Sequence, residues 1–353
     1  MSSPISITPK FVQQVQFLPS NKDLYSCLLV NKHWATCAVP ILWEAPFRIN
    51  NGHILSYKMI QTYLAFIPDS TFRKLGYNRR IGLSNNRPLF FNYPSFLKEF
   101  SFDQFLNSAI ANNCCKDIII ELFKILVMND VKLCRIDIYN HNCFNHYSEN
   151  LNKIGYLLSM PMQKAQLFNA IAKDCHNIKI LKISIYDKNE GIALEGLIRS
   201  QRNLKKFTLI NSNIFASFPI QALVNQKHSL DSLALEDMHD NRDFLSKKFF
   251  NYTICQLNSS AINALAQCTK ISKIKFKHCE GINSSVFLPL AIAFPNLTSL
   301  EYTYAQPLLD YYLDSLCTSC NTLKRIVFDW HLEAHLDITQ LVEIISQQRN
   351  KST

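Results

Sequence analysis

The most regular feature of this 353-residue chain is an apolar pattern that returns at a fixed interval. Three apolar residues in the spacing L-x-x-L-x-L recur six times, and successive copies begin 26, 26, 41, 26 and 26 residues apart. The copies are Ile178/Leu181/Ile183, Leu204/Phe207/Leu209, Leu230/Leu233/Leu235, Ile271/Ile274/Phe276, Leu297/Leu300/Tyr302 and Leu323/Ile326/Phe328. Apolar residues two positions apart indicate a short strand, and a constant period indicates a stack of repeated units.

Two weaker copies of the pattern precede the regular ones, at Leu97/Phe100/Phe102 and Leu133/Ile136/Ile138. We therefore expect about eight repeats between residues 90 and 350. The 41-residue step is one period plus 15 residues, which predicts an insertion near residues 237–256.

The segments between the predicted strands show the spacing of amphipathic helices. The apolar positions are Ile192, Leu194, Leu197 and Ile198 in one segment and Ile262, Leu265 and Ala266 in another. Each repeat is therefore expected to be one parallel strand followed by a helix that returns the chain on the outer side. Such units bury their apolar faces only against their neighbours.

A helical pattern also precedes the repeats. Ser20 with Asp23 three positions later is typical of a capping box, and we expect a helix over residues 20–37 that Pro40 ends. Its apolar positions are Leu24, Cys27, Leu28 and Trp34.

A shorter helix is expected around residues 11–15, beginning near Pro9. Two or three short helices at the start of the chain form a core too small to be very stable alone. We therefore expect another surface to cover them.

Composition limits the classes of function that the chain can have. The 37 basic and 27 acidic residues leave a net charge of +10, which favours an acidic partner. Only seven glycines are present, and none forms a phosphate-binding loop, so no nucleotide site or other cofactor is expected. Since no nucleophile or paired-carboxylate motif has a supporting context, the chain is expected not to be an enzyme.

The twelve cysteines are spread along the chain, which favours reduced thiols in a cytoplasmic or nuclear protein. The longest apolar runs are shorter than the roughly 20 residues of a membrane-spanning helix, so no membrane partner is expected. The pairs Cys317/Cys320 and His331/His335 resemble a zinc site, but a predicted repeat strand fills the gap between them. No metal is therefore expected.

Two stretches carry a resemblance to known families. Residues 268–282, with Cys268-x-x-Ile271-x-x-Ile274-x-Phe276-x-x-Cys279-x-x-Ile282, resemble the cysteine-containing class of leucine-rich repeat. Cys175 and Cys320 hold the position of Cys268 in their own repeats. Residues 18–47, LPSNKDLYSCLLVNKHWATCAVPILWEAPF, resemble the F-box found in a large group of fungal proteins whose C-terminal part is leucine-rich repeats.

The two resemblances imply an α/β fold with a defined domain order. The expected architecture is a leucine-rich-repeat solenoid, a horseshoe with parallel strands on its concave face and helices outside, preceded by a small helical F-box. The F-box is expected at residues 5–47, a linker or N-terminal transition at 48–89, and the repeats at 90–350.

The function that the resemblance implies is that of the substrate-recognition subunit of an SCF-type cullin-RING ubiquitin ligase. The F-box would bind the Skp-type adaptor, and the repeats would bind a protein substrate. By motif position, the adaptor contacts are Pro9, Phe11, Val15, Leu24, Leu28, Leu29, Val30 and Trp34. Trp43 and Phe47 are expected to pack the F-box against the first repeats.

Basic residues stand between the core positions of the repeat strands. They are Arg135, Lys182, Lys206, Lys273, Lys275, Lys277 and Arg325. Neighbouring strands about 4.8 Å apart would place these cations in columns that attract an acidic or phosphorylated substrate segment. The alternative is an ordinary solvent-facing side of the sheet, because Asp137, Glu236, Glu301 and Asp329 interrupt the stripe.

Two further alternatives stay open at this point, and a third is less favoured. Lys10 stands where an acidic residue is typical, so the chain could be a repeat scaffold whose divergent F-box does not engage the adaptor. Residues 20–47 could instead be a cap that covers the open end of the stack. Nucleic-acid binding is not expected, because no aromatic residues alternate with the basic ones.

Overall fold

A computed structural model of the chain describes residues 21–47, 53–75, 90–128, 132–138, 161–185, 187–210, 216–238, 259–279, 293–303 and 322–329. The chain divides into two compact units, Met1–Arg135 and Ile136–Thr353. Several predicted features lie outside the described residues: the helix around residues 11–15, nearly all of the insertion near 237–256, and the cysteine and histidine pairs between residues 317 and 335.

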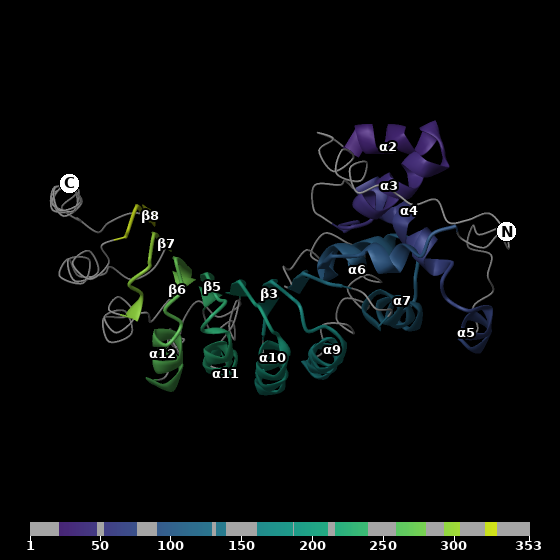
Figure 1. The fold of residues 1–353 in the computed structure, drawn as a ribbon. Helices are drawn as coiled ribbons and strands as arrows, with labels where there is room; N and C mark the ends of the chain where they lie inside the picture. The colour runs from purple at the N-terminus through teal and green to yellow at the C-terminus, as the bar shows by residue number, and fades with distance from the viewer. Residues whose placement is uncertain are drawn as a thin grey trace. The chain divides into compact units, whose positions relative to one another are not determined.

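The first unit is mainly helical (Figure 1). A 3-10 turn (Tyr93–Phe96) and the short strand β1 (Glu99–Ser101) lie between its fourth and fifth described helices. Two of its helices fall in the segment expected to be a transition, and Ile60, Tyr63 and Ile67 in this segment are buried. The helices are α2 (Asn21–Val30), α3 (Lys32–Leu42), α4 (His53–Leu64), α5 (Asp69–Lys74), α6 (Phe102–Ala111) and α7 (Lys116–Met128).

The expected single helix over residues 20–37 is two helices, α2 and α3, separated at Asn31. Asn31 has extended backbone angles, and its side-chain oxygen accepts a hydrogen bond of 3.0 Å from the Trp34 N–H. An asparagine in this position caps a helix, because its side chain satisfies an N–H that has no partner inside the helix. The apolar spacing continues across the break, which is why spacing alone did not locate it.

The expectation that Pro40 ends the helix is also wrong, because α3 continues to Leu42. Proline has no N–H, so at position 40 the helix loses one bond to the carbonyl four residues earlier. The Trp43 N–H donates to the Val39 carbonyl at 3.0 Å and closes the last turn. Pro40 is therefore accommodated within the last turn of α3.

The helices α2 and α3, defined here as the helical head, are followed by Trp43 and Phe47. The Trp43 ring lies 5.2 Å from Tyr63, and the buried Phe47 ring lies 6.0 Å from Phe100 and 5.5 Å from Phe105. Phe100 is a core position of the first irregular repeat. The expected packing against the start of the repeats therefore matches the contacts of Phe47, whereas Trp43 contacts Tyr63 of α4.

The second unit alternates strands with helices (Figure 1). Its strands β2 to β8 follow one another in the sheet in the order of the chain, and the described pairs from β3 to β8 are parallel. The helices lie together on one side of this sheet. The strands are β2 (Arg135–Ile138), β3 (Ile180–Ser184), β4 (Lys206–Ile210), β5 (Ser232–Met238), β6 (Lys273–Cys279), β7 (Ser299–Thr303) and β8 (Arg325–Asp329). The helices are α9 (Pro161–Asp174), α10 (Lys188–Ser200), α11 (Ser217–Ala222) and α12 (Ser259–Ala266).

The pairing of the strands reproduces the predicted alignment of the repeats. Leu181 pairs with Phe207, Phe207 with Leu233, and Leu233 with Ile274. Every described pairing from β3 to β8 joins residues 26 apart, except that β5 and β6 pair at a separation of 41. The predicted α/β repeats, their six regular strands and their register are therefore confirmed.

The same pair of main-chain hydrogen bonds joins successive repeats at several places in the described chain. The carbonyl of Lys179, one residue after the first core position, accepts from the N–H groups of Lys205 and Lys206 at 2.8 and 2.9 Å. The carbonyls of Lys98, Lys205, Asp231, Ser272 and Thr298 accept the corresponding pairs in their repeats.

The same pair of main-chain hydrogen bonds also connects the end of the helical head to the first repeat. The Glu44 carbonyl, one residue after Trp43, accepts from the N–H groups of Lys98 and Glu99 at 2.8 and 3.0 Å. The carbonyl of Glu44 thus bonds to the first repeat in the same way as the corresponding carbonyls of the repeats. The apolar period begins only at Leu97, so the sequence pattern did not reveal this connection.

The buried faces of the return helices agree with the predicted spacing except at one residue. Leu194, Leu197 and Ile198 of α10 are fully buried, whereas Ile192 is 48% exposed. Ile192 and Leu194 are two residues apart and so point to different sides of a helix. Including Ile192 in the buried face was therefore wrong.

Buried glutamines form a polar bridge between repeats. Gln201 stands three residues before the core residue Leu204, the position that Cys175 and Cys268 occupy in their repeats. Its side-chain amide donates to the Cys175 carbonyl at 2.8 Å, and its oxygen accepts from the Ile178 N–H at 3.0 Å. Both partners belong to the preceding repeat, so this side chain satisfies main-chain groups that have no access to water.

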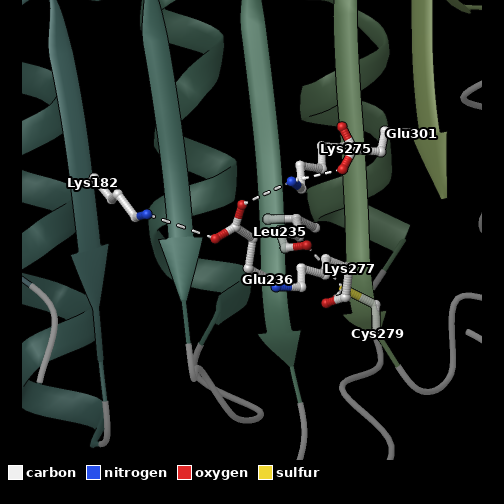
Figure 2. Close-up of polar contacts among 7 residues, drawn as sticks. All are labelled: Lys182, Leu235, Glu236, Lys275, Lys277, Cys279 and Glu301. Carbon is white, nitrogen blue, oxygen red and sulfur yellow. Dashed lines mark hydrogen bonds and ion pairs between the residues drawn. The ribbon is translucent and has the colours of Figure 1, made fainter. Parts of the chain in front are cut away.

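Cysteines have a related structural role. Cys175, Cys268 and Cys279 are buried, and Cys279 Sγ lies 3.1 Å from the carbonyl of Leu235 on the preceding strand (Figure 2). Burial raises the pKa of both Cys175 and Cys268 to about 11. The expected structural role of these three thiols is confirmed, and Cys320 lies outside the described residues.

One ion pair is buried beneath the repeats. Lys164 Nζ of α9 lies 3.7 Å from Glu190 Oε2 of α10 and donates to Ser184 Oγ of β3 at 3.1 Å. A buried ion pair is a weak source of net stability, but removing one partner leaves a charge without compensation. The pair therefore constrains how α9 and α10 pack on β3.

The glutamine bridge predicts a difference between two identical substitutions. Gln201→Leu leaves buried main-chain groups without partners and is expected to lower the free energy of unfolding by about 1–3 kcal/mol. Gln267→Leu, at an exposed glutamine that bonds only within its own helix segment, is the control and is expected to change it by less than about 0.5 kcal/mol. Urea unfolding followed by circular dichroism measures both, and equal effects would contradict the bridge.

The buried thiols predict a pattern of alkylation. Near about pH 8 a thiol reacts through its thiolate, and a raised pKa keeps Cys175 and Cys268 protonated in the folded protein. Iodoacetamide is expected to label these two slowly before unfolding and rapidly in concentrated urea. The half-buried Cys115 is the internal reference and is expected to react earlier. Mass spectrometry of the labelled peptides gives the order, and rapid native labelling of Cys268 would contradict it.

Candidate functional site

The first candidate site is an apolar surface on α2, defined here as the α2 surface and formed by Tyr25, Leu29 and Val30. Leu29 is 89% exposed, Val30 59% and Tyr25 37%. Tyr25 and Leu29 are four residues apart and so share one side of the helix. Neighbouring exposed apolar side chains of this size are typical of interaction surfaces.

The residues predicted to contact an adaptor separate into three groups. Leu29 and Val30 are exposed, whereas Leu28 and Trp34 are partly buried against the core between α2 and α3. Leu24 is only 5% exposed and belongs to that core together with Cys27, Cys37, Ala38 and Leu42. Leu24 therefore supports the helices from inside and is not part of the α2 surface. Pro9, Phe11 and Val15 lie outside the described residues.

The junction of α2 and α3 positions this surface. Because Asn31 caps α3, α2 ends at Val30, and Leu29 and Val30 lie at its C-terminal end. Close to the junction, Lys32 Nζ lies 4.5 Å from the centre of the Phe90 ring, which is itself exposed. A cation over an aromatic face stabilises both side chains modestly, and it holds another apolar group near the start of α3.

The second candidate site is the side of the second unit's sheet that faces away from its helices, defined here as the open face. Strand pairing arranges its residues in columns that cross the strands. The first column is Ile180, Lys206, Ser232, Lys273, Ser299 and Arg325, and the middle column is Lys182, Thr208, Ala234, Lys275, Glu301 and Val327. Lys277 pairs with Glu236 in the next column along the strands.

The predicted basic residues therefore belong to different columns. Lys206, Lys273 and Arg325 are in the first column, Lys182 and Lys275 in the middle column, and Lys277 in the column after it. Arg135 lies at the start of β2. The expectation of cations at these solvent-facing strand positions matches the register, but the columns differ in their charge balance.

Acidic residues neutralise the middle of the open face (Figure 2). Glu236 lies between Lys182 and Lys275, at 3.8 and 3.7 Å from their amino groups, and Lys275 also reaches Glu301 at 2.7 Å. Burial alone would lower the pKa of Lys275, but the hydrogen bond and charge of Glu301, with the charge of Glu236, outweigh it and raise that pKa. Two of the predicted substrate-binding lysines are thus engaged in ion pairs.

The first column keeps its positive charge. Lys206, Lys273 and Arg325 are all exposed, and none of them has an acidic partner within the described ranges. Half-buried Ser232 and Ser299 stand between them. The open face therefore has a neutral middle and a basic border, a division that the order of residues in the chain did not reveal.

Other kinds of site receive no support from the described part of the chain. It contains no group of three histidine, cysteine, aspartate or glutamate residues placed to hold a metal ion. Within the same residues, no helix is long and apolar enough to span a bilayer.

The ion pairs of the open face predict a small coupling energy. In a double-mutant cycle of Lys275→Met and Glu301→Gln, the coupling is expected to be below about 1 kcal/mol, because both groups are about one-third exposed and solvent screens their attraction. The coupling should fall as salt is added. The exposed pair Arg199 and Glu195 on α10 is the control and is expected to give a similar value. A coupling of several kcal/mol insensitive to salt would contradict this account.

Comparison with known proteins adds no relative. No protein-family model matches the chain, and no curated protein matches it. Its function is therefore inferred from the residues of the α2 surface, the repeats and the open face.

Proposed function

We propose that this protein is the substrate-recognition subunit of an SCF-type cullin-RING ubiquitin ligase, an F-box protein with leucine-rich repeats. Its F-box would bind the Skp-type adaptor through the α2 surface, and its repeats would bind a protein substrate. The observation that carries the proposal is the exposed pair Leu29 and Val30 on a small helical head, in a chain whose second unit is a stack of 26-residue repeats.

The α2 surface has the properties of a docking surface for another protein. Burying a leucine or valine side chain contributes about 1.5–3 kcal/mol, so leaving two of them in water has a cost that a partner would remove. The helical core beneath them consists of only a few residues, including Leu24, Cys37 and Leu42. An F-box uses its helices in this way, and residues 18–47 resemble one.

The repeats support the second half of the proposal. Parallel strands at a constant 26-residue separation, helices on one side of the sheet and buried cysteines at equivalent positions are the features of cysteine-containing leucine-rich repeats. The open face of such a sheet offers many side chains for recognising a protein, and its strands hold those side chains in fixed columns.

The proposed mechanism is proximity rather than chemistry. The receptor performs no covalent step itself and needs no cofactor. It binds a target with one surface and the ligase with another, which converts a bimolecular encounter into a tethered one at high effective concentration. A receptor of this kind acts in the cytoplasm or the nucleus, where the ubiquitin machinery works.

Capture by a purified Skp-type adaptor tests the proposal. The intact chain is expected to bind, and Leu29→Asp is expected to weaken binding at least about tenfold, because a carboxylate would be buried in an apolar interface. Ile192→Asp introduces the same charge at another exposed apolar residue, on α10, and is the control with unchanged binding. Thermal unfolding of both variants checks that the fold is retained.

The possible results separate the proposal from its alternative. No capture by the intact chain would remove the ligase role and leave a repeat scaffold with a divergent F-box. Equal capture by Leu29→Asp and the intact chain would exclude the α2 surface as the docking site.

A further inference from the structure

Exposed basic residues gather at the edge of the second unit's sheet where the strands begin, defined here as the basic edge. The residues are Lys179, Arg202, Lys205, Lys206, Lys227, Lys270, Lys273, Lys324 and Arg325. All of them are exposed. They come from the short segments that connect each helix to the next strand and from the first residues of the strands.

Acidic residues compensate little of this charge. In the described part of the same segments the acids are Asp174 and Asp231. Asp231 is half-buried, and its carboxylate accepts a hydrogen bond from the hydroxyl of Ser272 in the next repeat. The edge therefore carries a strong positive field, in contrast with the paired charges in the middle of the open face.

Stabilisation of the helices does not explain the whole basic edge. Cations after a helix interact favourably with its negative end, and this accounts for residues such as Arg202 after α10. Lys206, Lys273 and Arg325 lie in strands, where no such benefit exists. Three exposed cations in one column are instead suited to binding an anionic partner.

The spacing of this column indicates what kind of partner fits. Lys206, Ser232, Lys273, Ser299 and Arg325 are on successive strands, so a cation and a hydroxyl alternate across the sheet. Successive strands are about 4.8 Å apart, which separates neighbouring cations of the column by roughly 10 Å. A peptide in the polyproline II conformation advances about 3.1 Å per residue with three residues per turn, so its side chains at every third position lie on one side, about 9 Å apart.

We propose that the basic edge binds an acidic segment of a protein in the polyproline II conformation, with anionic side chains at positions i, i+3 and i+6 opposite Lys206, Lys273 and Arg325. Ser232 and Ser299 would donate hydrogen bonds to the segment between these ion pairs. The inference deepens the proposed function and rests on it, since the acidic segment would be the part of the substrate that the receptor recognises.

Several observations favour a peptide over a nucleic acid. Binding of single-stranded nucleic acid relies on exposed aromatic side chains on which bases stack. The first and middle columns of the open face contain no aromatic residue in the described strands. Hydroxyls between the cations are better matched to the carbonyl and carboxylate groups of a peptide.

Fluorescence anisotropy with synthetic peptides and the full-length protein tests the inference. The probe is a labelled peptide with glutamates at every third position, and its control has the same composition with the glutamates adjacent. The spaced peptide is expected to bind at least about fivefold more tightly, because each carboxylate can reach its own cation. A third peptide with phosphoserines at the spaced positions distinguishes phosphate from carboxylate as the source of charge, and binding of either spaced peptide supports the inference.

Two charge reversals show where the peptide binds. Lys273→Glu, at the centre of the column, is expected to weaken binding of the spaced peptide at least about tenfold. Lys188→Glu makes the same change of net charge at an exposed residue of α10, away from the basic edge, and is expected to weaken it less than about threefold through the long-range field.

Three results would overturn the inference: equal affinity for the spaced and adjacent peptides, equal effects of the two reversals, or tighter binding of a single-stranded oligonucleotide that Lys273→Glu abolishes. The assay uses no adaptor. Its failure would therefore remove the acidic-segment inference and leave adaptor capture through Leu29 as a separate question.

Discussion

The repeated pair of main-chain hydrogen bonds between successive units is the constraint on which the rest of the structure depends. A single carbonyl, such as that of Lys179, accepts two N–H groups of the next repeat and so sets the register before the strands begin. Once the register is set, each apolar core residue meets its equivalent in the next repeat, as Phe207 meets Leu233. Burial then follows, because such units cannot cover their apolar faces alone. The head obeys the same constraint through Glu44.

This stacking also decides how charges on the sheet meet. Lys182 and Glu236 are 54 positions apart in the chain and on strands separated by another strand, yet they form an ion pair. Lys273 and Lys275 are two positions apart, and only Lys275 has acidic partners within the described residues. Two lysines of one strand thus differ in what they can bind. The difference comes from the residues that neighbouring repeats supply in each column.

The helical head leaves apolar side chains in water, although its own core is small. Its small core is completed by Leu24, Cys37 and Leu42, while Leu29 and Val30 remain in water. Since an apolar surface of this kind is costly unless another protein covers it, the head is suited to binding a partner. Its connection to the repeats through Trp43, Glu44 and Phe47 is both apolar and hydrogen-bonded, so the head continues directly into the first repeat.

The sequence by itself determined the features that depend on local periodicity. These are the strands, their 26-residue register, the buried core and the structural cysteines, because each repeat places chemically similar residues at equivalent positions. Only the tertiary structure decided the features that depend on a particular neighbour. Asn31 divides an apolar pattern that looks continuous, Gln201 takes the place of a cysteine in bridging repeats, and Leu24 faces the core whereas Leu29 faces water. A period shows which positions are equivalent, but the partner of each polar side chain is set by residues that folding brings together.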